Sequence, residues 1–326
     1  MTSSRRQFLH LAAGAATLPA LSRPASAQAY PVRPVRIIVG LPPGGVNDIV
    51  ARLIAEWLTE KLEQPFVIEN RPGASGNIAA AAVAKAPPDG YTLMLVGSQN
   101  PVNAALYRGR LDFDLVHDIA PVAGVTRQPN VMVVNPATPA TTVPEFIAYA
   151  KANAGKINMA STGSGTPSHV AGELFKMMTG APMTHVPYRG GAPALTDLIG
   201  GQVQVYFGAL ASSLALIKSG KLRALAVTSA ARLDVLLDIA AVAEFVPGYE
   251  ASGLFGVGAP RNTSIEVIDK LNKTINAGLA DARISAKLFE LGGTVLAGSP
   301  DDFGKFIVDE IEKWARVVKF AGIKPE

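Results

Sequence analysis

The sequence predicts an α/β protein of two domains, in each of which helices flank a mixed, mostly parallel sheet. A length of 326 residues fits two domains at the usual ~100–200 residues each. Short apolar runs of strand length alternate with longer segments in which apolar residues recur every three or four positions. Such alternation is typical of parallel sheets covered by helices.

The first hundred residues predict the order strand, helix, strand, helix, strand. The three strands are expected at Val35–Val39, Phe66–Glu69 and Tyr91–Val96, because each is a short apolar run bounded by turn residues. The second helix is the Ala-rich segment Asn77–Lys85. The first helix follows from one apolar stripe, formed by Val46, Ile49, Val50, Leu53, Ile54, Trp57, Leu58 and Leu62.

The middle of the chain repeats this alternation. Thr142 and Glu145 form a capping box, which predicts a helix that ends near Asn153. Another helix is expected from Pro167 to Met178. The strands expected around these helices are Val131–Asn135, Ile157–Ala160, Met183–Val186, Val203–Phe207 and Leu222–Thr228.

The last third predicts one strand and two helices. The strand is Leu254–Gly258, and Ser264 and Glu266 then begin a helix that runs to Leu279. The final helix is expected at about Asp301–Phe320, where Phe303, Phe306, Ile307, Ile311, Trp314, Val317 and Val318 form one stripe.

The order of these elements predicts how the chain divides. No flexible linker separates the two α/β units, so we expect crossovers between them near Asn130 and Gly253. Domain 1 then comprises residues 30–129 and 254–326, and domain 2 comprises residues 130–253. Since ligands bind beyond the carboxyl ends of parallel strands, the cleft between the domains is the expected binding site.

Residues 1–29 are interpreted as a twin-arginine signal peptide. Arg5 and Arg6 precede a short uncharged apolar stretch, and small residues at 25–29 offer two overlapping cleavage sites. The alternative is a general secretory signal in which the paired arginines occur by chance. Either way we expect export, with the mature chain beginning near Tyr30.

Composition excludes several classes of function. The first 29 residues hold three of the 30 Lys and Arg and no acid, so the remainder carries 27 basic against 26 acidic residues. A nearly neutral chain lacks the electrostatic footprint of a nucleic-acid or anionic-membrane partner. The absence of Cys excludes disulfides, thiolate metal sites and a Cys nucleophile. We find no catalytic motif and no pair of His at metal-ligand spacing, so we expect neither an enzyme nor a metal nor a cofactor.

Two loops are candidates for binding an anion. Each joins a strand to a helix, and each is rich in Gly, Ser or Thr. The N–H groups at a helix N-terminus lack internal partners and lie at the positive end of the helix dipole, so they attract anions. The alternative is that each loop only caps its helix after a tight turn. The candidate ligand-binding residues are Pro43, Gly44 and Gly45 in the first loop and Ser161, Ser164, Gly165 and Thr166 in the second.

Four further residues are weaker candidates. Ser98 and Gln99 follow the third strand and would lie on the rim of the cleft, or they form an ordinary polar turn. His169 is a possible donor to the ligand, or a helix His satisfied within the fold. Tyr188 could cover a ligand with its amphipathic ring, or it packs in the core.

The sequence resembles the Bug family, the TctC-like substrate-binding receptors of tripartite tricarboxylate transporters. The resemblance runs along the whole chain after residue 30. It rests on Arg33–Val39, Pro42–Gly45 with Asp48 and Ala51-Arg52, Glu69–Gly73, Pro88–Leu93, Ala148–Lys151, His185–Tyr188 and Gly220–Val227.

This resemblance implies a periplasmic protein with the two-domain type II periplasmic binding fold. It implies a receptor that closes on a small organic acid and delivers it to the large and small membrane subunits of the transporter. The ligand carboxylate would lie between the loop at Pro43–Gly45 and the loop at Ser161–Thr166. We expect a monomer. Two alternatives stay open: a periplasmic sensor that docks onto a membrane signalling protein, and an exported hydrolase that uses Ser164 or His169.

Overall fold

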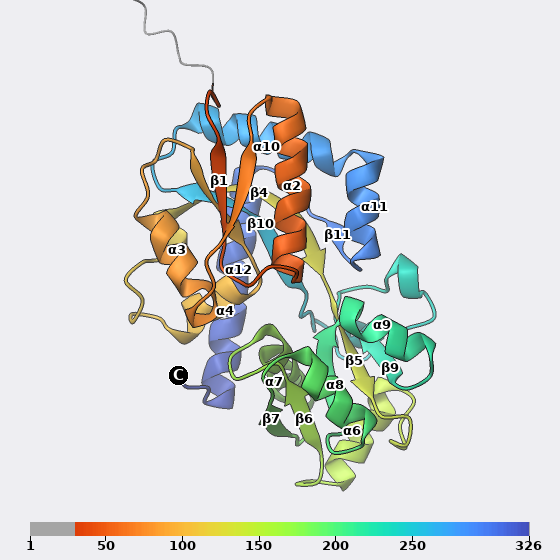
Figure 1. The fold of residues 1–326 in the computed structure, drawn as a ribbon. Helices are drawn as coiled ribbons and strands as arrows, with labels where there is room; N and C mark the ends of the chain where they lie inside the picture. The colour runs from red at the N-terminus through yellow and green to blue at the C-terminus, as the bar shows by residue number, and fades with distance from the viewer. Residues whose placement is uncertain (1–29, 326) are drawn as a thin grey trace, which may run out of the picture. The chain divides into compact units, whose positions relative to one another are not determined.

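Two mixed sheets organise residues 33–325 (Figure 1). The computed structural model describes residues 30–325, and the expected signal peptide at 1–29 lies outside the described residues. No described helix has the length and apolar character needed to cross a membrane. The prediction of an α/β fold with helices flanking mixed sheets is confirmed, but the expectation that the sheets are mostly parallel is wrong, because five of the nine strand pairings among the described residues are antiparallel.

The first sheet has the strand order β11-β4-β10-β3-β1-β2. Strand β1 pairs in parallel with β2 and β3, whereas β10 is antiparallel to both β3 and β4, and β11 is antiparallel to β4. The strands are β1 (Val35–Val39), β2 (Phe66–Asn70), β3 (Thr92–Val96), β4 (Ile119–Gln128), β10 (Gly253–Pro260) and β11 (Thr294–Val295).

Helices cover both faces of the first sheet. Helices α2 and α10 pack against each other, and Trp57 Nε1 of α2 donates a 2.7 Å hydrogen bond to the Thr274 carbonyl of α10. Helices α3, α4 and α12 contribute to a second apolar cluster. The helices are α2 (Val46–Leu62), α3 (Asn77–Ala84), α4 (Gln99–Leu106), α5 (Leu115–Asp118), α10 (Ile265–Leu279), α11 (Ala282–Glu290) and α12 (Pro300–Ala321).

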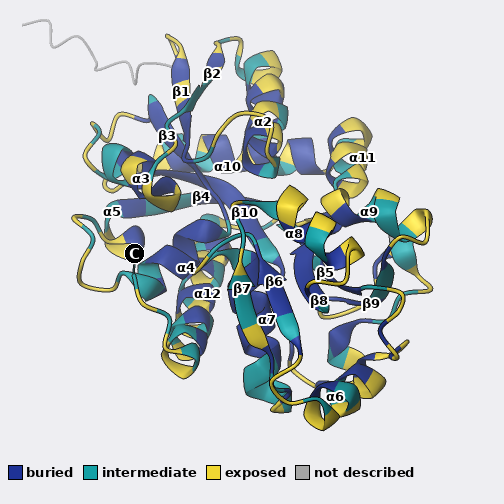
Figure 2. Cartoon of the chain, turned by 60° about the horizontal axis from the view of Figure 1, so that its bottom comes forward, coloured by how far each residue is buried: buried dark blue, intermediate teal, exposed yellow. Residues whose placement is uncertain are grey.

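The second sheet has the strand order β7-β6-β8-β5-β9. Strand β6 is parallel to β7 and β8, and β5 is antiparallel to β8 and β9. Figure 2 shows buried strands at the centre of each sheet, with exposed residues on the outer faces of the helices. The elements are β5 (Asn130–Val134), β6 (Asn158–Ser161), β7 (Thr184–Pro187), β8 (Val205–Ala209), β9 (Arg223–Val227), α6 (Val143–Ala152), α7 (Pro167–Thr179), α8 (Gly191–Ile199) and α9 (Leu210–Lys218).

The chain crosses between the sheets twice, and the two crossings are hydrogen-bonded to each other. Pro129 separates β4 from β5, and the chain returns to the first sheet after β9, through Ala251, to β10. The Asn130 N–H donates to Thr228 Oγ1 at 2.8 Å. The Thr228 hydroxyl also lies 3.0 Å from the Asn130 carbonyl oxygen and 3.1 Å from the Ala251 carbonyl oxygen. A single hydroxyl group therefore joins both crossings.

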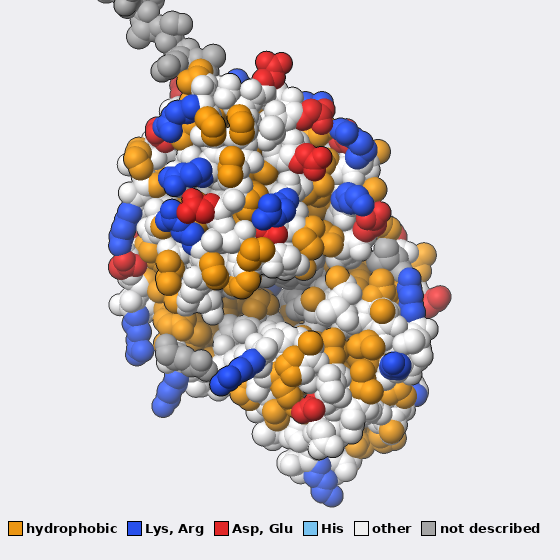
Figure 3. Space-filling view, viewed as in Figure 1, with side chains coloured by type: hydrophobic (Ala, Val, Ile, Leu, Met, Phe, Trp, Pro, Cys, Tyr) orange, Lys and Arg blue, Asp and Glu red, His pale blue; other side chains and the backbone are white. Residues whose placement is uncertain are grey.

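On the face of the molecule seen in Figure 3, charged side chains of both signs are intermixed. In Figure 3, Lys and Arg side chains alternate with Asp and Glu over the visible face, and the surface is hollowed between α2 and the helices of the second sheet. This distribution agrees with the nearly neutral composition of residues 30–326.

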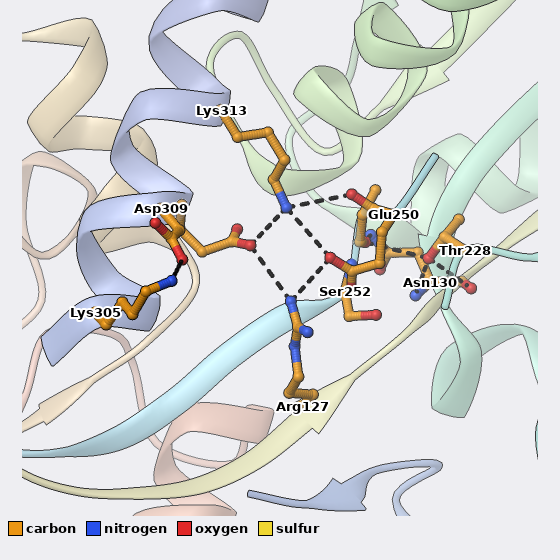
Figure 4. Close-up of polar contacts among 10 residues, drawn as sticks. Arg127, Asn130, Thr228, Glu250, Ser252, Lys305, Asp309 and Lys313 are labelled. Atoms are coloured by element: carbon orange, nitrogen blue, oxygen red, sulfur yellow. Dashed lines mark hydrogen bonds and ion pairs between the residues drawn. The ribbon is translucent and has the colours of Figure 1, made fainter. Parts of the chain in front are cut away.

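A cluster of four charged side chains lies beside the crossings (Figure 4). Arg127, at the end of β4, donates to Glu250 at 2.8 Å and lies 3.4 Å from Oε1 of Glu310 on α12. Lys313 of α12 donates to Glu310 at 2.5 Å and lies 3.4 Å from the Glu250 carboxylate. Burial raises the pKa of Glu310, although Lys313 and Arg127 favour its charged form. We call these residues the crossing cluster.

Most expected elements are present within a few residues of their predicted ends. Thr142 caps α6 as predicted, because its side chain accepts a hydrogen bond from the Glu145 N–H. Strand β4 and helix α11 were not predicted. The interpretation of Gly97–Asn100 as a turn is wrong in part, since Gln99 begins helix α4.

Candidate functional site

One cavity of about 260 Å³ is lined by residues of both sheets and by residues next to both candidate loops. Val46 and Asn47 come from the first turn of α2, and Thr162, Pro167 and Ser168 come from the turn that enters α7. The helix starts that follow the two loops therefore border one space, but the predicted loop residues themselves do not line it: Pro43, Gly44, Gly45, Ser161, Ser164, Gly165 and Thr166. The remaining lining residues are Ser98, Gln128, Pro129, Asn130, Tyr206, Ala209, Gly253 and Phe255.

The N-terminus of α2 provides backbone donors on the side of the first sheet. Gly45 is the N-cap in extended conformation, and no side chain caps the helix, so the first-turn N–H groups have no acceptor within it. The expectation of unpaired loop amides is wrong for Gly44, whose N–H donates to Asp48 Oδ2 at 3.0 Å. A hydrogen bond from Arg52 is the main cause that lowers the pKa of Asp48 to about 2, so this carboxylate stays charged and paired.

Replacing Gly45 by Val tests the first loop. A Cβ at Gly45 has only the Pro42 carbonyl oxygen near it, at 3.9 Å, and φ is −82°, so the backbone tolerates a side chain. We expect wild-type stability, but binding of a carboxylate about tenfold weaker, because the branched side chain covers the first-turn N–H groups. Calorimetric titration checks this, with Gly45→Ala as the smaller control. Unchanged affinity in Gly45→Val would remove this loop from the site.

Hydroxyl groups dominate the turn that enters α7. Ser168 Oγ accepts from the Thr162 N–H at 2.8 Å and lies 2.9 Å from Thr162 Oγ1 and 3.1 Å from Thr166 Oγ1. The Gly165 N–H is not free, because it donates to Nδ1 of His169 at 3.0 Å. Ser164 is exposed on the same turn. This loop thus presents bonded hydroxyl groups to the cavity, whereas the first turn of α2 presents backbone N–H groups.

Two stacked histidines contact the turn that enters α7. His169 and His185 stack with ring centroids 3.5 Å apart, and His185 Nε2 lies 2.6 Å from Oγ of the buried Ser161. Glu173 lies 3.6 Å from His169 Nε2 and pairs with Lys176 at 2.8 Å. Neither histidine lines the cavity. Their contacts position the loop Ser161–Pro167 on the second sheet.

The histidine stack predicts a pH dependence of stability. Burial, followed by the neighbouring His169, lowers the pKa of His185 from 6.5 to about 4. Between these pH values the unfolded chain binds more protons at this site than the folded chain, so this contribution to stability falls as pH drops from 6.5 to about 4. Urea unfolding should show a shallower loss over this range in His185→Gln than in the wild type. The exposed His117→Gln is the control, and equal slopes in wild type and His185→Gln would contradict the assignment.

The other candidates differ in position. Ser98 lines the cavity beside Gly253. A Cβ added at Gly253 would lie 3.1 Å from Ser98 Oγ. Gln99 is buried, and its Nε2 lies 3.3 Å from Asn100 Oδ1. Tyr188 does not line the cavity; its hydroxyl donates to Asp197 at 2.6 Å.

Three cavity residues with unbonded polar groups were not predicted from the sequence. Asn47 is 8% exposed and Gln128 9%, and Asn47 Oδ1 and Gln128 Nε2 have no hydrogen-bond partner. Tyr206 is 1% exposed, and its side chain makes no hydrogen bond within the described residues. Asn47 Oδ1 packs beside Gly97, whereas the Asn47 amide N–H group, Gln128 and the Tyr206 hydroxyl are neutral donors of the lining that a ligand acceptor could use. For Asn47 the available signal was its position two residues after the N-cap.

The chemistry of the cavity is that of binding. Its described lining contains no Lys, Arg, Asp, Glu or His, so it has neither a general base nor a nucleophile with an adjacent base. No group of three His, Asp or Glu within residues 30–325 is arranged to hold a metal. Neutral donors and helix N–H groups can hold an anion without a dedicated cation.

Two mixed sheets, two crossings and a polar cavity between the sheets define a solute-binding protein. The family model "Tripartite tricarboxylate transporter family receptor" matches residues 50–323. This chain belongs to that family of receptors.

Individual relatives cover nearly the full length of the chain. Protein BugT of Bordetella pertussis is 38% identical over 93% of this chain and 94% of the relative. The structure of R. palustris Rpa4515 with adipate is 40% identical, with a TM-score of 0.79 over 91% of this chain and 100% of that one. MatC from Rhodopseudomonas palustris with bound malate is 30% identical, with a TM-score of 0.74 over 89% and 100%.

Proposed function

We propose that this chain is a periplasmic solute receptor that binds a small carboxylate between its two sheets. It delivers this ligand to the large and small membrane subunits of a tripartite tricarboxylate transporter. The observation that carries the proposal is the shared cavity, in which the uncapped N-terminus of α2 lies beside neutral side-chain donors such as the Asn47 amide. Two relatives with adipate and with malate support the ligand class.

The carboxylate binds at the first turn of α2 in this proposal. The N–H groups there have no intrahelical acceptor, and the helix dipole contributes roughly half a positive charge at the same end. The Asp48 carboxylate is already bonded by Arg52 and Gly44, so it does not compete for the N–H groups that face the ligand. The Ser161–Pro167 turn contributes hydroxyl groups from the opposite side.

The proposal includes the architecture around the ligand. Residues 30–129 and 254–326 form one domain and residues 130–253 the other, and the receptor works as a monomer. Export follows the twin-arginine route directed by residues 1–29. Attachment of residues 1–29 to a reporter protein, with and without replacement of Arg5 and Arg6 by Lys, tests the route by export of the reporter.

Calorimetric titration of residues 30–326 tests the ligand class. The panel contains mono-, di- and tricarboxylates of three to eight carbons, and the uncharged diamide of each binder serves as the control. We expect at least one acid to bind and its diamide not to bind. A ligand at 100 times its Kd raises stability by about 2.7 kcal/mol, which a thermal shift detects. Failure of every acid in both assays would overturn the proposed function.

Transport is tested separately in the bacterium that carries the gene. Uptake of the acid identified by titration should be lost when the receptor gene is deleted and restored by the wild-type gene. Normal uptake in the deletion strain would leave a binding protein without the transport role.

A further inference from the structure

Tyr206 has a polar group that the fold itself leaves unused. The residue lies near the end of β8, is 1% exposed and lines the cavity, yet its hydroxyl makes no hydrogen bond within the described part of the chain. The hydroxyl oxygen is not one of the fully buried polar atoms that lack a partner, so it keeps accessible surface at the cavity, and a Tyr hydroxyl in such a position usually has a partner. The unused hydroxyl therefore marks a position where a ligand can accept a hydrogen bond.

The position of the ring depends on a glycine two residues further along the strand. A Cβ at Gly208 would lie 1.9 Å from Cε1 and 2.4 Å from Cζ of the Tyr206 ring. Residues 206 and 208 lie on the same side of β8, so any side chain at 208 would displace the ring. Glycine at 208 is what allows the phenol to lie flat along the strand.

The hydroxyl lies on the side of the second sheet, opposite the first turn of α2. A Cβ at Gly191, the first residue of α8, would be 3.4 Å from the Tyr206 hydroxyl oxygen. Burial raises the pKa of Tyr206 to about 12, so the phenol remains a neutral donor at physiological pH. Gln128 is a second neutral side chain of the lining with an unbonded donor.

We propose that Tyr206 is a specificity-determining residue that donates a hydrogen bond to an acceptor on the far end of the ligand, away from the carboxylate bound at α2. This inference rests on the proposed function. It narrows the ligand to a carboxylic acid that carries a second acceptor, either a carboxylate or an amide carbonyl. The supporting residue is Gly208, which keeps the ring in place.

Ligands that differ only in the second acceptor measure the contribution of the Tyr206 hydrogen bond separately from the affinity for the rest of the ligand. For each chain length from four to eight carbons, the titration uses the dicarboxylate, its half-amide and the monocarboxylate without the second acceptor. The wild type should bind at least one acceptor-bearing acid about tenfold or more tighter than the matched monocarboxylate. In Tyr206→Phe this difference should nearly disappear, while the affinity for the monocarboxylate stays unchanged.

Two further variants complete the test. Gly208→Ala should reproduce the loss of selectivity by displacing the ring, with the thermal midpoint reported beside it. If Gly208→Ala fails to fold, Tyr206→Phe decides alone, because it removes one oxygen and no packing atoms. Tyr188→Phe is the matched control, since its hydroxyl bonds Asp197 outside the cavity, and it should keep wild-type selectivity.

The outcomes distinguish this inference from the proposed function. Binding of the acids with equal selectivity in wild type and Tyr206→Phe would overturn the role of Tyr206 and leave the receptor function standing. An equal affinity of the wild type for monocarboxylates and acceptor-bearing acids would also overturn it. If the wild type binds none of the acids, both proposals fall.

Discussion

Asn47→Leu should weaken binding of the carboxylate ligand about 10- to 100-fold while leaving the protein at least as stable as the wild type. Asn47 is buried in the lining of the cavity, and its side-chain amide N–H group, which makes no hydrogen bond within the described residues, can donate to the carboxylate. Loss of a hydrogen bond to a buried or charged group costs about 1–3 kcal/mol, which corresponds to this range in Kd. Leu has a similar branched shape and no unsatisfied polar atom, so the free energy of unfolding should stay constant or increase.

Asn100→Leu is the matched control for this experiment. Asn100 is also buried and follows β3, but its Oδ1 accepts a 2.8 Å hydrogen bond from the Gly97 N–H and it does not line the cavity. Replacing it leaves this N–H unpaired, and we expect a loss of about 1–3 kcal/mol in the free energy of unfolding. Denaturant unfolding and calorimetric titration should give opposite results for the two variants. Asn47→Leu should lose affinity and keep its stability, whereas Asn100→Leu should lose stability and keep its affinity. A destabilised Asn47→Leu variant with normal affinity would show that Asn47 serves the fold and not the ligand.

Arg127→Met should lower the free energy of unfolding by about 2–4 kcal/mol. Arg127 pairs with Glu250 and Glu310 in the crossing cluster, and its removal leaves Lys313 as the one remaining cation of the cluster for two carboxylates. Breaking a buried ion pair costs about 3–5 kcal/mol, and we expect less here because Arg127 and Glu250 are partly exposed. Urea unfolding at pH 7.5 measures the loss.

The pH dependence of this variant provides a second check. Burial already raises the pKa of Glu310, and removal of Arg127 should raise it further. A carboxyl with a raised pKa in the folded state binds its proton more readily than in the unfolded chain, so it favours folding at low pH, and this advantage is lost as pH rises. The deficit of Arg127→Met should therefore shrink between pH 7.5 and pH 5.

Lys305→Met is the control on the same helix. Lys305 and Asp309 form an exposed pair one turn apart, visible beside the crossing cluster in Figure 4, and such pairs contribute about 0.3–0.5 kcal/mol. If Arg127→Met costs no more than Lys305→Met, the crossing cluster does not stabilise the fold.

Local sequence patterns were sufficient for most of the fold. The apolar stripe of α2 and the capping box of α6 depend only on residues close together in the chain, and both elements occur where expected. Strand β4 was missed because Pro121 and Gly124 interrupt its apolar pattern, while pairing with β10 holds it in the sheet. Helix α4 was missed because it begins with Gln99, Asn100 and Pro101, a composition typical of a turn.

The candidate site likewise combines local features, which the sequence reveals, with contacts between distant residues, which it does not. Helix N-termini are local features, so the sequence identified the two helix starts that border one cavity, although the lining residues there are neighbours of the predicted ones. Gln128, Tyr206 and Phe255 come from strands far apart in sequence, and only the sheet pairing and the crossings bring them together. The bonds that occupy the Gly44 and Gly165 amides likewise depend on side-chain rotamers that spacing does not determine.

The bonds of Thr228 have a mechanical consequence. Because one hydroxyl lies within hydrogen-bond distance of a carbonyl oxygen on each connection, it couples the two connections to each other. A substitution at Thr228 would therefore disturb both connections at once.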